Sequence, residues 1–298
     1  MSFYPIFKLR DWVDKSRLCK YILTENVNAI DLFLKEPEMM YWGYLSGNKN
    51  PRAIDILEKN INRIEWPLLS SNPSAIHLLK KNMWNIDWEY LSENPNAIQL
   101  LEENQERITP WNICRNPNAM NLLKLNPDWI NWHQISRNPK AIEILTKNVD
   151  KINWKRLCSN PNARCLIEKY PENINWTALS INPNAIHILK NNLDKVCWYH
   201  LSINPNAIEI LKNNVDKIRW YGLMQNPNAI EIIEKNQDKI DWSILSKNPS
   251  IFELDKKEMM NKMKPMAEEI TKAVFNPNRL LKIGETYNID LIDLVEIY

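Results

Sequence analysis

The histidines are the side chains best suited to bind a metal or move a proton, and their spacing keeps them apart. His77 and His187 occupy the same place in a repeated pattern of 22 residues but stand five repeats apart. At ~8–10 Å per packed helix layer, five repeats separate them by ~40–50 Å. His187 and His200 could approach each other within one repeat, yet no Cys, Asp and His cluster around them has ligand spacing. We therefore expect no metal site and no cofactor.

Other catalytic patterns are also missing from the sequence. The chain holds 4 glycines, none of them in a phosphate-binding loop, and no serine stands in a nucleophile elbow. Carboxylates recur at one position of the repeat, as Asp128, Asp150, Asp194, Asp216 and Asp238, but the residue after each is usually basic, as in Asp194-Lys195 and Asp216-Lys217. These pairs indicate a solvated ridge. We predict that the protein is not an enzyme.

The elements that must position any site come from the repeat itself. Asn-Pro pairs recur every 22 residues, beginning at Asn50, Asn72, Asn94, Asn116, Asn138, Asn160, Asn182, Asn204, Asn226 and Asn248. A fixed period in this range indicates a solenoid, in which one unit cannot bury its own apolar face and must stack on its neighbours.

The first half of each unit has the pattern of an amphipathic helix. Asn at position 1 is a preferred N-cap, and Pro at position 2 suits the first helical turn. Positions 4, 5, 7 and 8 form an apolar stripe, for example Ala185, Ile186, Ile188 and Leu189. Asn at position 11 tolerates the left-handed conformation that ends many helices. Position 3 varies, so we expect it to matter less to stability than position 1.

The second half predicts a shorter helix. An aliphatic residue at position 15 and an Asn or Asp cap at position 16 precede Trp at position 17 and Leu or Ile at position 20. Because this Trp is in phase with the aliphatic residues, we expect it to be buried between units throughout. The tryptophans are Trp66, Trp88, Trp132, Trp154, Trp176, Trp198, Trp220 and Trp242.

These patterns predict an all-α protein. A period of 22 leaves no room for a βαβ unit, and Pro at the start of the apolar stretch argues against a central strand. We predict a right-handed α-solenoid of about a dozen helix-turn-helix units, elongated and capped at both ends. Long helices should begin at the residue after each Asn of position 1.

The two ends of the chain depart from the period. We assign residues 1–25 to an N-terminal cap, residues 26–249 to the tandem repeats and residues 250–298 to C-terminal capping helices with one divergent repeat. Asn26 restarts the motif 24 residues before Asn50, and we place the two extra residues between Lys35 and Gly47. Near the C-terminus, Pro265 is expected to divide two helices.

The net charge and the cysteines indicate which partners and which cellular location to expect. The formal net charge is +2, which gives no overall attraction to nucleic acid or to an anionic membrane. Five Cys residues show no metal or disulfide spacing, and Cys114 and Cys158 stand where Ser is usual, which indicates small buried thiols. No signal peptide or membrane-spanning run is recognisable. We expect an intracellular, reducing location.

The motif Asn-Pro-Asn-Ala-Ile followed by Trp-x-x-Leu-Ser resembles the short-repeat proteins of giant DNA viruses of amoebae. The stretch from Val274 to Leu281 (VFNPNRLL), with Tyr287 to Asp290 (YNID), is similar to the ending of such proteins. The resemblance covers nearly the whole chain. It implies a viral all-α repeat protein without an established enzymatic role, located in the host cytoplasm or the virion, and it transfers no catalytic residue.

The leading functional prediction is a non-catalytic scaffold that presents its variable positions 6, 9, 10, 13, 18 and 22 to a protein partner or to a second copy of itself. Met residues after the repeats either seal the last unit or also form a docking face for a homodimer. The candidate interface residues are Trp84, Trp111, Trp129, Met259, Met260, Met263 and Met266. The alternative is a solenoid that reads or coats single-stranded nucleic acid, although position 6 is too acidic for a groove that follows a phosphate backbone.

Overall fold

The computed structural model describes residues 4–276, 278–280 and 282. The chain divides into two compact units: Leu9–Phe252, which contains the repeats, and a second unit made of residues 1–8 with residues 253–298. The compact unit Leu9–Phe252 is built almost entirely of short helices, so the all-α prediction is confirmed. Two short strands, β1 (Phe7–Leu9) and β2 (Phe252–Leu254), pair with each other. The helical periodicity did not predict them.

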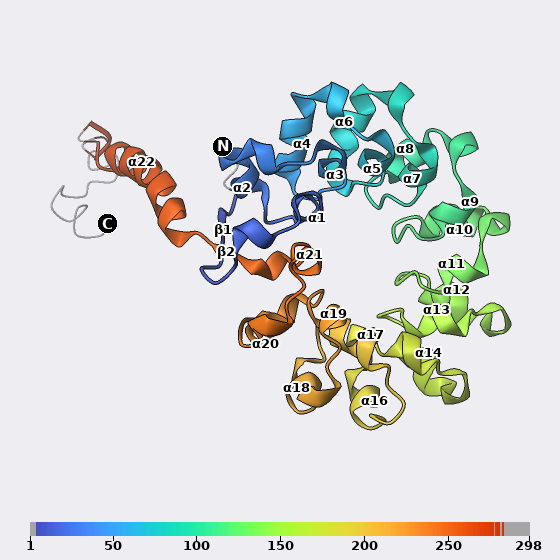
Figure 1. The fold of residues 1–298 in the computed structure, drawn as a ribbon. Helices are drawn as coiled ribbons and strands as arrows, with labels where there is room; N and C mark the ends of the chain where they lie inside the picture. Colours follow the sequence, from blue (N-terminus) through green and yellow to red (C-terminus); the bar gives the residue numbers. More distant parts are fainter. Residues whose placement is uncertain (1–3, 277, 281, 283–298) are drawn as a thin grey trace. The chain divides into compact units, whose positions relative to one another are not determined.

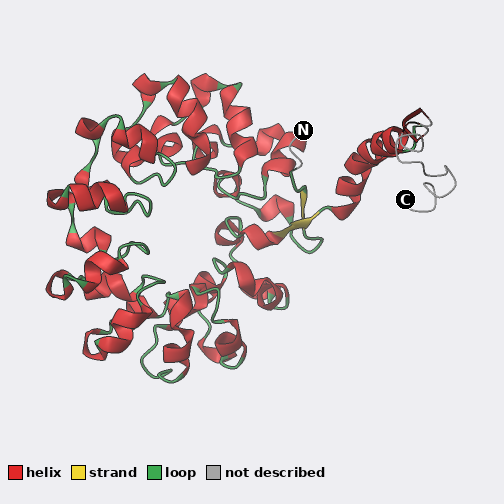
Figure 2. Cartoon of the chain, turned by 180° about the vertical axis from the view of Figure 1, so that it is seen from behind, coloured by secondary structure: helices red, strands yellow, loops and turns green. Residues whose placement is uncertain are grey.

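Most repeats contribute one helix to each of two layers, which Figures 1 and 2 show as an outer and an inner row. The outer helices are α2 (Ile30–Lys35), α4 (Pro51–Glu58), α6 (Ile76–Lys81), α8 (Ile98–Glu102), α10 (Met120–Leu125), α12 (Ile142–Thr146), α14 (Arg164–Lys169), α16 (Ile186–Lys190), α18 (Ile208–Lys212) and α20 (Ile230–Glu234). The inner helices are α1 (Lys20–Thr24), α3 (Trp42–Leu45), α5 (Trp66–Ser70), α7 (Trp88–Ser92), α9 (Pro110–Ile113), α11 (Trp132–Ile135), α13 (Trp154–Cys158), α15 (Trp176–Leu179), α17 (Trp198–Ile203), α19 (Trp220–Leu223) and α21 (Trp242–Leu245).

Short 3₁₀ turns complete the repeats. Those between an outer and an inner helix are η2 (Pro37–Met39), η3 (Ile61–Arg63), η5 (Met83–Asn85), η6 (Gln105–Arg107), η7 (Pro127–Trp129), η8 (Val149–Lys151), η9 (Pro171–Asn173), η11 (Val215–Lys217) and η13 (Gln237–Lys239). Those that follow the Asn of position 1 are η4 (Pro73–Ala75), η10 (Pro183–Ala185), η12 (Pro227–Ala229) and η14 (Pro249–Ile251), and η1 (Lys15–Arg17) lies near the N-terminus.

The outer helices begin later than the sequence predicted. In most units the α-helix starts at position 5, for example at Ile186, whereas Pro183–Ala185 forms a 3₁₀ turn. The side chain of Asn182 accepts the backbone N–H of Asn184, two residues on, which tightens this first turn. Only α4 starts directly after its Asn, at Pro51. The prediction of a long helix after every Asn was therefore wrong.

The Asn at position 11 ends the outer helix by a different mechanism from the expected one. Asn60, Asn82 and Asn104 have φ angles of −138°, −131° and −140°, so they are not left-handed. Instead, their side-chain Nδ2 donates to the carbonyl four residues earlier, at 2.9, 2.8 and 2.9 Å. The carboxamide thus satisfies a carbonyl that the end of a helix leaves without a partner.

One Asn in every unit connects that unit to its predecessor. Its Oδ1 accepts the backbone N–H two residues on. Its Nδ2 donates at 2.7–3.2 Å to two carbonyls, that of position 1 in the preceding unit and that of position 21 in the unit before it. All eleven side chains are at most 2% exposed. We call them the asparagine ladder: Asn26, Asn48, Asn72, Asn94, Asn116, Asn138, Asn160, Asn182, Asn204, Asn226 and Asn248.

The ladder shows where the period is interrupted. Asn48, not Asn50, makes the ladder contacts, with Nδ2 donating to the Thr24 and Asn26 carbonyls. Asn50 instead takes the role of position 3 and donates to the Val27 carbonyl, while also capping α4. The two extra residues therefore lie between Asn48 and Asn72, and their expected place between Lys35 and Gly47 was wrong. They lengthen α4 at its start.

A second row of hydrogen bonds runs beside the ladder. The side chain at position 21, usually Ser, accepts the backbone N–H of position 16 in the next unit, as Ser202 Oγ does from Arg219 at 3.0 Å. Cys114 and Cys158 replace Ser and accept through Sγ at 3.2 Å. Both thiols are buried, as predicted, and burial raises their pKa values above the usual thiol range.

The repeat array closes on itself. Asn26 Nδ2 donates to the Ser246 and Asn248 carbonyls at 3.0 Å each, which are the acceptors the ladder pattern requires. The N–H of Cys19 donates to Ser246 Oγ at 2.9 Å, continuing the second row. Lys247 also forms an ion pair with Glu25 at 2.6 Å. The last unit is thus composite, made of Asn248–Phe252 from one end of the array and residues 9–25 from the other.

This closure corrects two sequence predictions. Residues 9–25 complete a repeat instead of forming an N-terminal cap, and the repeats form a closed ring of eleven units instead of an elongated, open array of about twelve. In Figure 1 the blue N-terminal helices of the repeat unit lie beside the orange helices that end it. A right-handed sense of winding stays a prediction.

The Trp residues are less buried than expected. Trp242 is 7% exposed, but the other seven tryptophans predicted at position 17 are only half-buried. In five of these seven, and also in Trp42 and Trp242, a basic side chain of the next unit lies over the ring, with the charged group 4.6–5.1 Å from the ring centroid. These pairs are Arg63–Trp42, Arg107–Trp88, Lys151–Trp132, Lys195–Trp176, Lys217–Trp198, Lys239–Trp220 and, across the closure, Arg17–Trp242. The lysines at position 14 therefore pack on tryptophan and are not simply a solvated ridge.

The second compact unit contains one longer helix, α22 (Lys256–Val274), which includes Pro265. The expected division into two helices at this proline was wrong, because the surrounding Lys, Glu, Met and Ala residues all favour a helix. The divergent repeat expected after Asn276 lies largely outside the described residues. Within the described part of the chain, no helix combines the length and the apolar character needed to cross a membrane.

The ladder predicts unequal costs for two neighbouring asparagines. Asn182→Ala should lower the free energy of unfolding by about 2–4 kcal/mol, because it removes a cap and leaves two buried carbonyls without their donor. Asn184→Ala should cost less than about 1 kcal/mol, because its bond to the Pro161 carbonyl is solvent-exposed. Urea unfolding of the two variants measures the difference, and equal costs would contradict a dominant ladder.

Closure predicts that Asn26 behaves like an internal ladder residue. Asn26→Ala should destabilise the protein about as much as Asn182→Ala, because both side chains lose three equivalent hydrogen bonds. In an open array the amide of Asn26 would have no carbonyls to bind, and its loss would cost only its hydrogen bond with the Asn28 N–H. The same urea experiment decides between the two arrangements.

Candidate functional site

The histidines are all engaged separately. His77 and His187 lie on outer helices beside Glu58 and Glu168, at 3.9 and 2.9 Å. His133 stacks on Trp111 with ring centroids 5.9 Å apart, and His200 Nδ1 lies 3.2 Å from Cys197 Sγ. No group of three or more His, Cys, Asp and Glu side chains that could hold a metal occurs in the described residues.

The outer helices use most of their charges on one another. A lysine at position 9 reaches the acidic residue at position 6 of the next unit, as Lys190 does to Glu209 at 2.6 Å and Lys124 to Glu143 at 2.8 Å. Basic side chains at position 14 lie over tryptophan rings, as described above. Positions 6 and 9, which the sequence placed among the partner-facing sites, therefore belong largely to contacts between units.

The inner helices leave a different set of side chains exposed. Their buried residues at positions 20 and 21 pack into the ring wall, whereas positions 18, 19 and 22 carry the variable residues. We call the exposed side chains of these positions the inner belt. The belt includes Tyr21, Tyr44, Leu68, Tyr90, Trp111, Tyr199 and Tyr221, together with Arg115, Arg137, Lys155 and Lys247.

Three tyrosines form the largest aromatic cluster of this region. Tyr21, Tyr41 and Tyr44 have ring centroids 5.8–6.5 Å apart and come from α1 and from the start of α3. We call them the tyrosine triad. Tyr41 is 57% exposed, and Tyr21 and Tyr44 are also exposed to solvent. Aromatic rings of this size that stay in contact with solvent are typical of interface centres.

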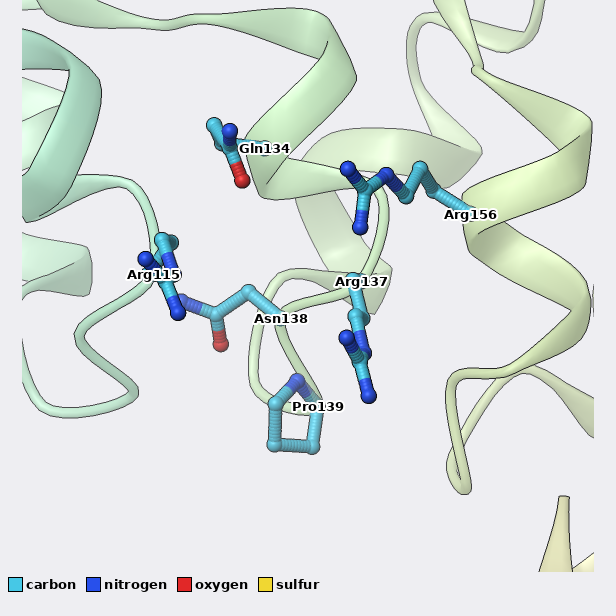
Figure 3. A pocket seen from close by; sticks show the side chains of 6 residues that line it. All are labelled: Arg115, Gln134, Arg137, Asn138, Pro139 and Arg156. Atoms are coloured by element: carbon cyan, nitrogen blue, oxygen red, sulfur yellow. The ribbon is translucent and has the colours of Figure 1, made fainter. Parts of the chain in front are cut away.

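Three arginines line a cavity of about 420 Å³ in another part of the ring. We call it the arginine pocket, and it is lined by Arg115, Gln134, Arg137, Asn138, Pro139 and Arg156. Figure 3 shows the three guanidinium groups and the carboxamide of Gln134 around one space. Asn138 belongs to the asparagine ladder, so the pocket is built directly on the ring wall.

The pocket is formed by three successive units. Arg115 and Arg137 are both at position 22, and Gln134 and Arg156 are both at position 19, each pair being one repeat apart. Arg115 Nη1 forms an ion pair with Glu93 at 2.8 Å. Arg156 Nε lies 3.3 Å from His133 Nε2, which holds its guanidinium in place. Positive charge therefore converges here, whereas position 22 carries only one other basic residue, Lys247, in the rest of the ring.

The predicted interface residues lie in both compact units, the tryptophans in the repeats and the methionines in α22. Trp84 in η5 is 97% exposed, Trp111 in α9 is exposed and Trp129 in η7 is half-buried. In α22, Met260 and Met263 are exposed and Met259 is half-buried, and the side chain of Met266 lies outside the described residues. Their role in an interface stays a prediction.

Sequence reasoning missed both the tyrosine triad and the arginine pocket. The pocket had a detectable signal, because Arg recurs at position 22 and a long polar side chain recurs at position 19 in adjacent units. The triad had a weaker one, since Tyr21 lies in the segment taken for a terminal cap. Compared with family models, with curated proteins and with solved structures, the chain matches none of them.

The outer charge row predicts a measurable pKa shift. Hydrogen bonds from Lys124 and Lys147 lower the pKa of Glu143 to about 2. Because the folded-state pKa is depressed, the stabilisation from these ion pairs is present above the unfolded value of ~4.3 and is lost as the pH falls toward ~2. A carboxyl-detected NMR titration should find this low value.

Lys124→Gln provides the matched comparison for this titration. It removes the first of the two donors, so the pKa of Glu143 should rise. The lowered pKa of Glu209, which depends on Lys190, should not change. A Glu143 pKa that is unaffected by the loss of Lys124 would contradict this assignment.

Proposed function

We propose that the protein is a non-catalytic, ring-shaped scaffold that binds a protein partner through its inner belt, with the tyrosine triad at the centre of the contact. The observation that carries the proposal is the exposure of three mutually contacting tyrosines on helices whose other side is buried in the ring wall. Tyr, Trp and Arg are the residues enriched at the centres of protein interfaces, and the belt carries five tyrosines, Trp111 and two arginines.

The partner's chemistry follows from the triad itself. Its three rings offer apolar faces and hydroxyl groups but no charge, so they suit an uncharged, apolar segment of the partner. Eleven inner helices packed side by side at ~8–10 Å form a circle ~28–35 Å across between helix axes. Subtracting one helix diameter of ~10–12 Å leaves room for a single helix or an extended segment against the belt.

Other functional predictions have less support. A single-strand nucleic-acid role would use basic and aromatic side chains around the whole belt, yet Glu25, Glu89 and Glu93 occupy belt positions. A homodimer through the methionines of α22, a viral origin and a location in host cytoplasm or virion remain proposals that follow from the sequence alone.

The triad predicts site-specific capture of the partner. A photo-crosslinking amino acid placed at Tyr41 should capture one discrete protein in cells that express the ring. The captured protein is then purified and titrated against the wild type and the double variant Tyr41→Ser with Tyr44→Ser. Loss of two hot-spot side chains should weaken binding roughly tenfold or more.

Two controls make the experiment decisive. The same crosslinking residue at Leu125, which is 79% exposed at the end of the outer helix α10, should not capture that protein. Leu125→Ser should leave the affinity unchanged. Equal capture at both positions, or equal affinity of the double variant, would rule out the triad, and capture of RNA or DNA at Tyr41 would favour the nucleic-acid alternative.

A further inference from the structure

We propose that the arginine pocket is a binding site for a phosphoryl group. The inference rests on the pocket's own contacts and does not depend on the protein-binding role of the tyrosine triad. The two sites draw on different side chains, so one can fail without the other.

The charge of the pocket is not balanced by the protein. Of the three guanidinium groups, only that of Arg115 has a carboxylate partner among the described residues, and that partner is Glu93. Arg137 and Arg156 form no ion pair with any described residue, and none of the six lining residues is acidic. The cluster thus keeps two uncompensated positive charges. A phosphate group, which carries about −1.5 to −2 at neutral pH, matches them more closely than a single carboxylate does.

The geometry of the arginines suits an oxyanion. Arg156 uses its Nε for His133, which leaves its two terminal nitrogens to donate to a ligand. Arg137 donates no hydrogen bond to the rest of the described chain through its side chain. Planar guanidinium groups bind phosphate oxygens through paired, charge-assisted hydrogen bonds.

Gln134 provides an independent indication of a ligand. Its side chain is 8% exposed and points into the pocket beside the arginines, yet its carboxamide forms no hydrogen bond with any described residue. The equivalent residue one unit earlier, Asn112, donates its Nδ2 to the Glu89 carbonyl at 3.0 Å. The carboxamide of Gln134 therefore has its hydrogen-bonding groups available at the pocket, where a phosphoryl oxygen would accept from Gln134 Nε2.

The volume of the cavity indicates how large a ligand it can admit. At about 420 Å³ it falls within the range of ordinary ligand sites and exceeds the needs of a bare phosphate ion. It can therefore admit a phosphoryl group together with the group that bears it. The bearer is either a small phosphomonoester or a phosphorylated side chain, and both present the same oxygens to the arginines.

Calorimetric titration at fixed ionic strength tests the site with three probes: inorganic phosphate, O-phosphoserine and adenosine monophosphate. We expect saturable binding with one site per chain. Tighter binding of phosphoserine than of the nucleotide would indicate a phosphorylated protein as the source, and the reverse would indicate a small phosphomonoester. Absence of saturable binding for all three probes would overturn the proposal.

Four variants separate the site from general charge. Arg137→Gln and Arg156→Gln should each weaken binding roughly tenfold or more, because a hydrogen bond to a charged group is lost. Gln134→Leu should weaken it without any change in net charge. Arg219→Gln removes one exposed arginine elsewhere in the ring and should leave the affinity unchanged.

Thermal melting of each variant confirms that the fold is intact. Arg137→Gln is the safest variant, since the exposed Arg137 side chain makes no hydrogen bond with the described residues. If Arg137→Gln binds phosphate as tightly as Arg219→Gln does, the arginine pocket is not the site.

Discussion

The structure depends on one buried carboxamide per repeat. A ladder asparagine accepts one backbone N–H in its own unit and donates one hydrogen bond to a carbonyl in each of the two units before it. No other side chain of similar size combines an acceptor with two donors on one planar group, so Asp, Ser or Thr could cap the turn but could not also make both contacts to the preceding units. Because the group is buried, each missing bond would leave a polar atom without water, and this fixes the register between units.

Further contacts follow the same register. Once the carboxamide sets one unit against the next, a position-21 side chain meets the N–H of position 16, and a basic side chain lies over the preceding tryptophan. Each of these contacts is modest alone. Repeated around the ring, they make every interface between units nearly the same. The same uniformity lets Asn26 bind Ser246 and Asn248 as if they preceded it in sequence.

The positions of the repeat differ in how far contacts with neighbouring units constrain them. Outer positions 6 and 9 are occupied by ion pairs between neighbours, and position 14 covers tryptophan, so variation there is constrained by the adjoining unit. Positions 18, 19 and 22 of the inner helices make fewer such contacts with the adjoining unit, and their residues differ most from unit to unit. The tyrosine triad and the arginine pocket both lie at or beside these positions, in different parts of the ring. A closed ring of similar units can thus carry two chemically distinct surfaces without changing its wall.

The sequence by itself determined the unit: its helical class, its 22-residue period, the Asn or Asp caps of the inner helices and the buried thiols of Cys114 and Cys158. These features depend on local propensity and on spacing within one repeat, which a single chain displays directly. It also predicted the importance of the first asparagine, although for its cap alone. Contacts made by the amide across units have no signal within one repeat.

Only the tertiary structure decided how the units meet. Whether the array ends or closes depends on the small rotation between neighbours, summed over eleven interfaces, and no motif encodes that sum. The structure likewise decided that Asn48, and not Asn50, is the ladder residue of its repeat, because the Asn48 carboxamide reaches the carbonyls of Thr24 and Asn26. The arginine pocket combines Arg115, Gln134, Arg137 and Arg156 from three units because stacking places positions 19 and 22 of neighbours around one space. Distances across stacked units are set by packing, and packing is what a linear pattern does not contain.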